Sequence, residues 1–236
     1  MKLVECVPNF SEGRDFTKIK TITNAIKAVD GITVLDVDPG ADTNRTVVTF
    51  VGEPNTVAEA AFQGIKTASE VIDMSQHSGT HPRMGATDVC PFIPVSGVTI
   101  EECIELSKQV GQRVGEELGI PVYLYEKSAQ KPDREKLPTI RKGEYEGLSE
   151  KLKDKNWRPD FGPETLHVKA GAIVMGCREF LIAYNINLNT KDHRLATDIA
   201  FELREAGRSK RTPNPNSKNL LDGEIVRNDD GSAVKV

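Results

Sequence analysis

The sequence predicts an α+β protein in which helices cover one face of a mainly antiparallel sheet. Three observations support this class: short apolar runs rich in β-branched residues, longer segments with apolar residues at helical spacing, and Gly, Pro, Asn or Asp between them. The chain has 236 residues, enough to bury a sizeable core as one large domain or two small ones.

Strands and helices alternate in the first part of the chain. We expect, in order, a strand at Leu3–Val7, a helix carrying Ile19, Ile22, Ile26 and Val29, strands at Ile32–Val37 and Thr46–Val51, a helix at Asn55–Ile72 and a strand at Cys90–Val95. Asp38–Asn44 is predicted as a loop. The order β-α-β-β-α-β is that of the split βαβ, or ferredoxin-like, arrangement.

The later part divides into a third helical segment, a polar excursion and a second structured passage. Thr99 and Glu102 predict a capping box for a helix to about Leu118, which Gly119 ends. The remaining predictions are a strand at Pro121–Tyr125, a polar excursion at Lys127–Arg158 with short helical pieces, strands at Ala172–Met175 and Phe180–Ile186, a helix at Asp192–Ala206 and a polar tail to Val236. We place a domain boundary between residues 178 and 179, giving an N-terminal subdomain (1–178) and the start of a second one (179–236).

Composition excludes several classes of protein. The formal net charge of -4 argues against a nucleic-acid-binding protein, which would carry an excess of positive charge. The four cysteines lie far apart with no C-x-x-C pair, which argues against a disulfide framework or a zinc ribbon and favours a reducing compartment. With neither a signal-peptide pattern nor an apolar run long enough to span a bilayer, we expect a cytoplasmic protein without membrane contact.

One segment, Asp73–Val95, concentrates the reactive side chains. It holds two of the four histidines, His77 and His81, together with an arginine and two aspartates. Gly79 and Pro82 argue for a shaped loop between a helix and a strand. Titratable groups on a loop held by a rigid scaffold favour an active site.

A metal site is the alternative use of His77 and His81, because histidines four residues apart share one face of a helix. Gly79 and Pro82 oppose a helix here, and the Glu of an H-E-x-x-H motif is missing. We therefore predict no metal site. His77 stays open between a catalytic role and one in capping or orienting the loop.

Eight separate blocks, in the right order, give the chain a specific resemblance. They are Val4–Gly13, Leu35–Asp38, Thr43–Thr46, His81–Ala86, Asp88–Pro94, Pro121–Tyr125, Pro159–Pro163 and Ala183–Leu188. With these blocks, the sequence from about Leu3 to Arg208 resembles the formiminotransferase family.

The resemblance implies transfer of a formimino group from N-formimino-L-glutamate to tetrahydrofolate, in histidine degradation and one-carbon metabolism. It also implies two ferredoxin-like subdomains with a groove between them, a homodimer, tetrahydrofolate as cosubstrate and no metal. The family's second subdomain normally continues past the end of this chain. We therefore expect an incomplete second ferredoxin-like subdomain and weak tetrahydrofolate binding by this chain alone.

Formimino transfer requires a group that moves a proton. The carbon passes between two nitrogens through a tetrahedral intermediate, so the attacking amine must lose a proton and the departing amine must gain one. A neutral imidazole does both near pH 7. The family's catalytic histidine matches His81, which we assign as this acid and base. Asp38 is assigned beside it, to stabilise charge spread over the nitrogens or to hold the histidine tautomer.

Both implied substrates are anionic, so we expect positively charged side chains to bind them. Arg45 and Arg83 are candidates for binding the carboxylates of glutamate or of the folate tail through a bidentate fork. Asn44 is assigned with them to substrate binding. A structural salt bridge is the equally weighted alternative for each arginine.

A glycine-bracketed segment lies where the family places its folate-binding residues. They are Gly162, Pro163, Glu164, Thr165, Leu166, His167, Val168, Lys169, Ala170 and Gly171. Glycines let the backbone approach a flat pterin closely, and Lys169 is suited to an anionic folate tail. His167 is interpreted as a hydrogen-bonding wall residue, because the segment contains no aromatic ring for stacking.

Two functional classes remain open from the sequence. The first is a working glutamate formimidoyltransferase. The second is a catalytically idle relative that binds folate, or serves as an accessory subunit of a larger formiminotransferase and cyclodeaminase assembly.

Overall fold

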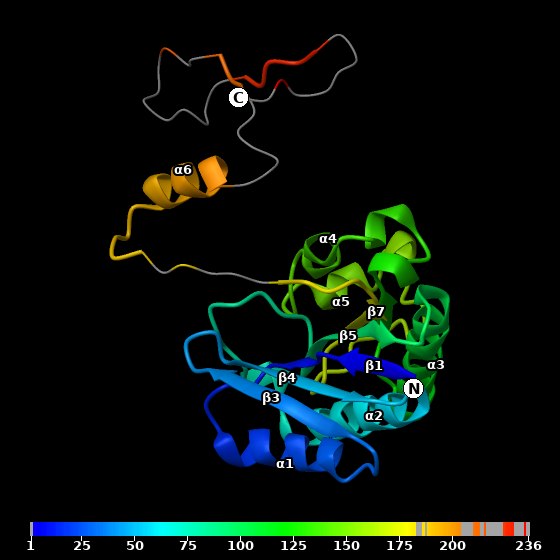
Figure 1. Ribbon diagram of the computed structural model, residues 1–236. Helices are drawn as coiled ribbons and strands as arrows, with labels where there is room; N and C mark the ends of the chain where they lie inside the picture. Colours follow the sequence, from blue (N-terminus) through cyan, green and yellow to red (C-terminus); the bar gives the residue numbers. More distant parts are fainter. Residues whose placement is uncertain are drawn as a thin grey trace. The chain divides into compact units, whose positions relative to one another are not determined.

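The computed structural model describes residues 2–182, 186, 188–203, 210–212, 215, 224–228 and 234. The chain forms two compact units, Met1–Leu181 and Ile182–Val236, each considered by itself (Figure 1). The domain boundary that we placed between residues 178 and 179 stays a prediction.

The first unit contains a seven-stranded mixed sheet, which confirms the predicted α+β class. Its strands are β1 (Leu3–Cys6), β2 (Asn9–Phe10), β3 (Thr33–Gly40), β4 (Arg45–Gly52), β5 (Thr87–Ser96), β6 (Val122–Leu124) and β7 (Ile173–Cys177). Across the sheet the order is β3, β4, then β1 and β2 together, then β5, β7 and β6. The pairs are antiparallel from β3 to β5, and β7 is parallel to both β5 and β6.

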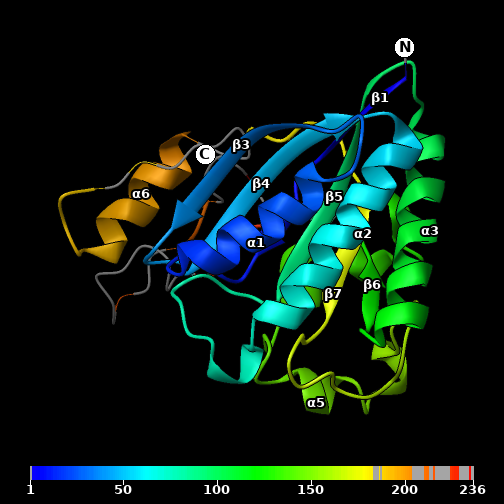
Figure 2. The ribbon, with the colours of Figure 1, turned by 90° about the horizontal axis from the view of Figure 1, so that it is seen from below.

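Three long helices lie side by side on one face of the sheet (Figure 2). They are α1 (Phe16–Lys27), α2 (Pro54–Val71) and α3 (Ile100–Leu118). Their apolar stripes and one face of the strands form the main core, which includes Phe10, Phe50 and Phe92. Because side chains alternate along a strand, the sheet has a second face that must be covered separately.

The polar excursion covers part of that second face, above β5, β7 and β6. It contains the short helices α4 (Leu137–Arg141) and α5 (Leu148–Lys151), which agrees with the short helical pieces predicted for it. A second core lies beneath them, formed by Met84, Val89, Tyr123, Tyr125, Ile140, Leu148, Leu152, Ala172 and Val174. The excursion therefore packs against β5, the strand that follows the loop His77–Ala86, here named the histidine loop.

Local sequence signals account for the helix ends. Asp15 accepts hydrogen bonds from the first backbone N–H groups of α1. Thr99 and Glu102 form the predicted capping box of α3, and Gly119 ends that helix at φ +64°. All four cysteines are free, as expected from their spacing, and all four are buried.

Some predicted strands had the wrong bounds. β3 continues to Gly40, so Asp38 lies in a strand and not in a loop, because residues 38–40 pair with the start of β4. β5 begins at Thr87, three residues before the predicted Cys90, because its first residues pair with β2. No strand is present at Phe180–Ile182 or at Ile186, where one was predicted, and 183–185 lie outside the described residues.

The second unit contains α6 (His193–Leu203), which agrees with the predicted helix from Asp192. The last predicted residues of that helix, 204–206, lie outside the described residues. Within the predicted polar tail, the N–H of Thr212 donates to the carbonyl of Glu224 at 2.9 Å, and Arg211 and Ile225 form an isolated antiparallel bridge.

Two glycines join the histidine loop to the segment that precedes β7. Gly85 and Gly171 form an antiparallel bridge, and the N–H of Ala172 donates to the carbonyl of Met84 at 3.1 Å. A Cβ atom on Gly85 would lie 2.2 Å from the carbonyl oxygen of Ala172, so no side chain fits. This backbone contact places the histidine loop beside the segment predicted to bind folate.

We expect Gly85→Ala to lower the free energy of unfolding by about 3 kcal/mol, because the added methyl group meets a fixed carbonyl. Gly119→Ala is the control: its φ of +64° strains alanine, but a Cβ there meets nothing within 4 Å. That strain costs about 1 kcal/mol. Urea unfolding of both variants tests the contact, and equal losses would contradict it.

Candidate functional site

The histidine loop leaves the end of α2 and enters β5. A short 3-10 turn at Met74–Gln76 follows α2, and the carboxylate of Asp73 caps it by accepting the N–H of Ser75 at 3.0 Å. The N–H of Met74 donates to the carbonyl of Lys169 at 2.9 Å. The backbone of the loop from His77 to Ala86 is thus held at its start by these bonds and at its end by β5.

His77 is held as a neutral ring by bonds to both of its nitrogens. The Nε of Arg83 donates to Nδ1 at 3.1 Å, so Nδ1 is the acceptor. Nε2 lies 3.0 Å from the carbonyl oxygen of Asn44 and therefore carries the proton. Burial lowers the pKa of His77, which agrees with this neutral form. Of the two roles open for His77, these contacts favour orienting the loop.

His81 is arranged differently, because only one of its ring nitrogens is used to hold it. Nδ1 lies 2.7 Å from the carbonyl oxygen of Pro82, which can only accept, so Nδ1 carries the proton. Nε2 is then the basic nitrogen of the neutral ring. Burial, followed by the positive charge of Arg45, lowers the pKa of His81 from 6.5. A half-buried histidine that stays neutral near pH 7 is suited to act as a general base.

A buried carboxylate lies at the start of β5, beneath this loop. Asp88 is fully buried and binds two arginines through Oδ2: Nη1 of Arg45 at 2.6 Å and Nη2 of Arg141 at 2.5 Å. Its Oδ1 accepts the N–H of Met84 at 2.8 Å. Asp88 therefore joins β4, α4 and the histidine loop at one point.

Arg83 uses all its donors within the protein. Its five N–H groups serve bonds to His77, Glu144 and Glu146, with the nearest carboxylate oxygen 2.7 Å away. The pKa of Arg83 is raised, first by its bond to Glu146. A ligand carboxylate reaches this guanidinium only by displacing a glutamate, so its predicted role in substrate binding stays a prediction.

Asn44 connects the loop to two other segments. At φ +48° it occupies the left-handed region, its Oδ1 accepts the N–H of Gly13 at 3.0 Å, and its Nδ2 donates to the carbonyl of Ser78 at 2.9 Å. These bonds position the chain around His77. The predicted contact of Asn44 with substrate stays a prediction.

Asp38 and Arg45 share a face of the sheet. Asp38 pairs with Val47, two residues along β4 from Arg45, and paired side chains project to the same side. Asp38 is exposed, whereas Arg45 is buried and donates to Asn9 at 3.1 Å as well as to Asp88. The catalytic role of Asp38 and the substrate contact of Arg45 stay predictions.

The segment Gly162–Gly171 runs beside the histidine loop and is partly exposed. Gly162 adopts φ +82° against α3, where a Cβ would meet the carbonyl of Ile120 at 2.5 Å. His167 accepts the N–H of Ala170 through Nδ1 at 2.9 Å, so it stabilises the turn. The hydroxyl of Tyr145 donates to the carbonyl of Val168 at 2.6 Å.

The sequence analysis assigned no role to four residues of this region: Asp88, Arg141, Glu144 and Glu146. A local signal existed only for Asp88, as a charged residue entering an apolar strand, which predicts a buried partner. The other three lie in the polar excursion, where charged residues are ordinary.

Among the residues that the structure describes, no group of three His, Cys, Asp or Glu side chains is arranged to hold a metal ion. The absence of a metal stays a prediction. No helix in this described part is long and apolar enough to cross a membrane.

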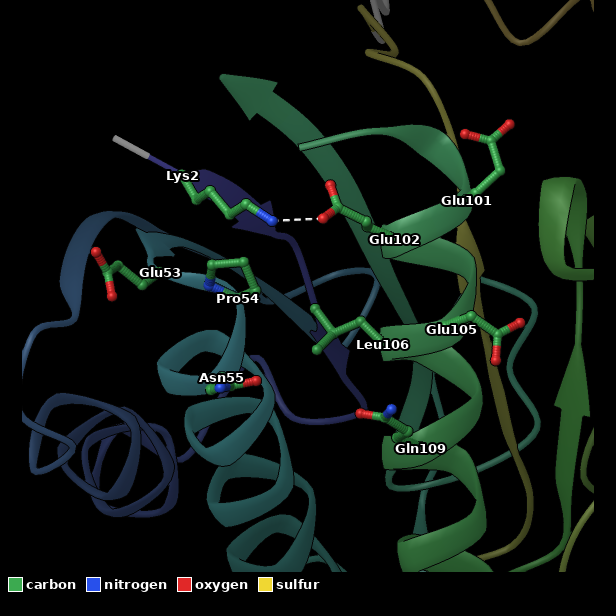
Figure 3. A pocket seen from close by; sticks show the side chains of 9 residues that line it. All are labelled: Lys2, Glu53, Pro54, Asn55, Glu101, Glu102, Glu105, Leu106 and Gln109. Atoms are coloured by element: carbon green, nitrogen blue, oxygen red, sulfur yellow. Dashed lines mark hydrogen bonds and ion pairs between the residues drawn. The ribbon is translucent and has the colours of Figure 1, made fainter. Parts of the chain in front are cut away.

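A cavity of about 630 Å³ lies between the N-terminal ends of α2 and α3 (Figure 3). Its lining includes Glu53, Glu101 and Glu105, with Lys2 paired to Glu102 across it. The histidine loop follows the opposite end of α2, a helix of 18 residues or about 27 Å. This acidic cavity is therefore separate from the histidine site and unsuited to an anionic substrate.

Comparisons with known proteins agree on one family. The family model described as "Formiminotransferase domain, N-terminal subdomain" matches residues 3–178. Formimidoyltransferase-cyclodeaminase of Dictyostelium discoideum is 55% identical over 213 residues, which are 90% of this chain and 39% of that protein. The chain thus spans about two fifths of that relative's length.

Shorter relatives are covered more fully. Glutamate formimidoyltransferase of Streptococcus pyogenes serotype M1 is 48% identical over 206 residues, 87% of this chain and 69% of that protein. The protein of the same name from Thermoplasma acidophilum is 52% identical over 206 residues, 86% of this chain and 68% of that protein.

We expect Asp88→Asn to lower the free energy of unfolding by about 3–5 kcal/mol, because it leaves two buried arginines without their anion. The control, Glu105→Gln, removes an exposed carboxylate 2.7 Å from Lys108 and should cost about 0–1 kcal/mol. Urea unfolding near pH 7 measures both, and a cost for Asp88→Asn no larger than that of the control would contradict the buried pairing.

The charges near His81 predict its titration. In an NMR titration we expect the His81 ring to have a pKa below 6.5, because burial and nearby arginines disfavour the imidazolium. Arg141→Gln should raise this pKa, since it removes a positive charge that repels the protonated ring. Lys136→Gln, an exposed cation of the same excursion, is the control. A lower pKa in Arg141→Gln would refute this electrostatic account.

Proposed function

The chain belongs to the formiminotransferase family, and from this we propose that it transfers the formimino group from N-formimino-L-glutamate to tetrahydrofolate, giving 5-formimidoyltetrahydrofolate and L-glutamate. The observation that carries the proposal is the neutral His81 ring, with Nδ1–H donated to Pro82 and Nε2 left basic. The relatives named glutamate formimidoyltransferase support this choice of reaction.

His81 moves the proton in the proposed mechanism. A C–N bond forms between the formimino carbon and the tetrahydrofolate nitrogen, whose proton passes to Nε2. The C–N bond to the α-nitrogen of glutamate then breaks, and the same proton is returned to that nitrogen. The lowered pKa of His81 keeps the ring mainly neutral, and thus able to accept a proton, near pH 7.

Fixed charges stabilise the reacting group in this proposal. The exposed carboxylate of Asp38 lies on the sheet face that carries Arg45, where it can balance the cationic amidine. Arg45 is held by Asp88 and Asn9, so its charge needs no reorganisation during the reaction. Asn44 fixes the loop that presents His81.

The segment Gly162–Gly171 is the proposed folate site. Its position beside the histidine loop supports this, because the pterin nitrogen must reach the formimino carbon. Glu164 and Lys169 are exposed at its surface, and Gly162 is exposed at its start, whereas Gly171 is buried against the backbone of Met84. The other partners implied by the family, a homodimer and a second subdomain completing the groove, belong to the same proposal.

The proposal includes a ferredoxin-like arrangement for the first part of the chain. The strand order β3, β4, then β1 with β2, then β5, with α1 and α2 on one face, supports it. β6 and β7 extend that sheet in parallel.

The transferase proposal predicts that His81→Ala lowers the rate of formimino transfer by about 10²–10⁴-fold, because a positioned acid and base is lost. The fold should persist, since the ring is only half-buried. Gln76→Ala is the control in the same loop, where the exposed side chain bonds only to Ser75. The assay is formation of 5-formimidoyltetrahydrofolate, and retention of more than about a tenth of the rate would refute the role of His81.

An inactive but folate-binding wild-type chain would support the idle or accessory alternative.

A further inference from the structure

A second, smaller cavity adjoins the histidine. It has a volume of about 280 Å³ and is lined by Pro82, Pro138, Arg141, Lys142, Gly143 and Glu144. Pro82 is the residue whose carbonyl holds the His81 ring. This cavity, unlike the acidic one between α2 and α3, is therefore lined by the residue that anchors the proposed base.

The cavity has an excess of positive charge. Asp88 carries one negative charge and binds both Arg45 and Arg141, which carry two positive charges. Lys142 adds another cation to the lining. Glu144 and Glu146 share the single positive charge of Arg83, which leaves one negative charge from that group, so an excess of one positive charge remains.

Arg141 has donors left for a ligand. Its Nη2 is bound to Asp88, but its Nε is buried and has no hydrogen-bond partner in the described part of the chain. This buried Nε lies out of a ligand's reach, whereas the side chain keeps 13% of its surface exposed and its Nη1 has no hydrogen-bond partner among the described residues, so Nη1 is the donor left for an anion. Arg83, by contrast, has no donor to spare.

We infer that the cavity lined by Pro82 and Arg141 binds the α-carboxylate of the formimino amino acid, with Arg141 as its main donor. This rests on the proposed function. In formiminoglutamate the α-carboxylate and the reacting nitrogen are attached to the same carbon. The base that serves that nitrogen must therefore lie next to the α-carboxylate, whereas the side-chain carboxylate is two methylene groups further away. Arginine is suited to this task because its planar fork matches a carboxylate.

The test compares amides of the product with the full chain. L-Glutamine keeps the α-carboxylate and L-isoglutamine keeps only the side-chain carboxylate. Calorimetry should show isoglutamine binding about 10- to 100-fold more weakly than glutamine, the value of a hydrogen bond to a charged group. This comparison in the wild type needs no variant, so it stands even if substitutions at Arg141 disturb folding.

Substitution then assigns the effect to the residue. Arg141→Gln should weaken glutamate and glutamine by the same factor and leave isoglutamine unchanged, whereas Lys136→Gln, outside the cavity, should change none. Arg141→Lys keeps the charge beside Asp88 and should give an intermediate loss. Circular dichroism confirms that each variant is folded.

Each other outcome overturns the inference. Equal affinities for the two amides, equal losses for both in Arg141→Gln, or no glutamate binding by the wild type would refute the α-carboxylate site. Transfer to tetrahydrofolate is measured in parallel. Discrimination between the amides without transfer would refute the proposed reaction alone, and transfer without discrimination would refute this subsite alone.

Discussion

The buried carboxylate of Asp88 is the charge on which the candidate site depends. A carboxylate removed from water must be compensated by hydrogen bonds and opposite charges, or the chain does not fold around it. Asp88 meets this demand with a guanidinium from β4, another from α4 and a backbone N–H of the histidine loop. Segments distant in sequence are thereby fixed around the two carboxylate oxygens of Asp88. Burial is the main cause of the lowered pKa of His81, and the charges of the two arginines held by these pairings lower it further.

Local signals in the sequence were sufficient for the long helices. The apolar stripe of α2, the capping box of α3 and the left-handed Gly119 are all properties of neighbouring residues, and each is found where it was predicted. The last residues of β3 were missed because their strand character comes from pairing with β4, which no local pattern encodes. The strand predicted from Phe180 failed for its described residues because an apolar run alone does not supply a partner strand.

Some features of the candidate site were also predicted from the sequence, and others were not. The loop that carries His81 was predicted from its residue types, and the catalytic role of His81 from the resemblance to the family. The tautomer of its ring was not, because it depends on which carbonyl the backbone presents to Nδ1. Arg141 could not be found, since its partner Asp88 lies 53 residues earlier and the surrounding excursion is rich in charge. Arg83 appeared available for ligands in the sequence, whereas in the fold two glutamates occupy it.

The bridge between Gly85 and Gly171 has a consequence for entropy. Two loops that bind different molecules usually lose conformational freedom separately, each when its own ligand arrives, and this loss weakens binding. Here the backbones of the two loops are already joined, with carbonyl oxygens so close that neither glycine has room for a methyl group. The ordering is completed when the chain folds. A site formed by these two segments, as proposed, would therefore need little further ordering to receive its substrates.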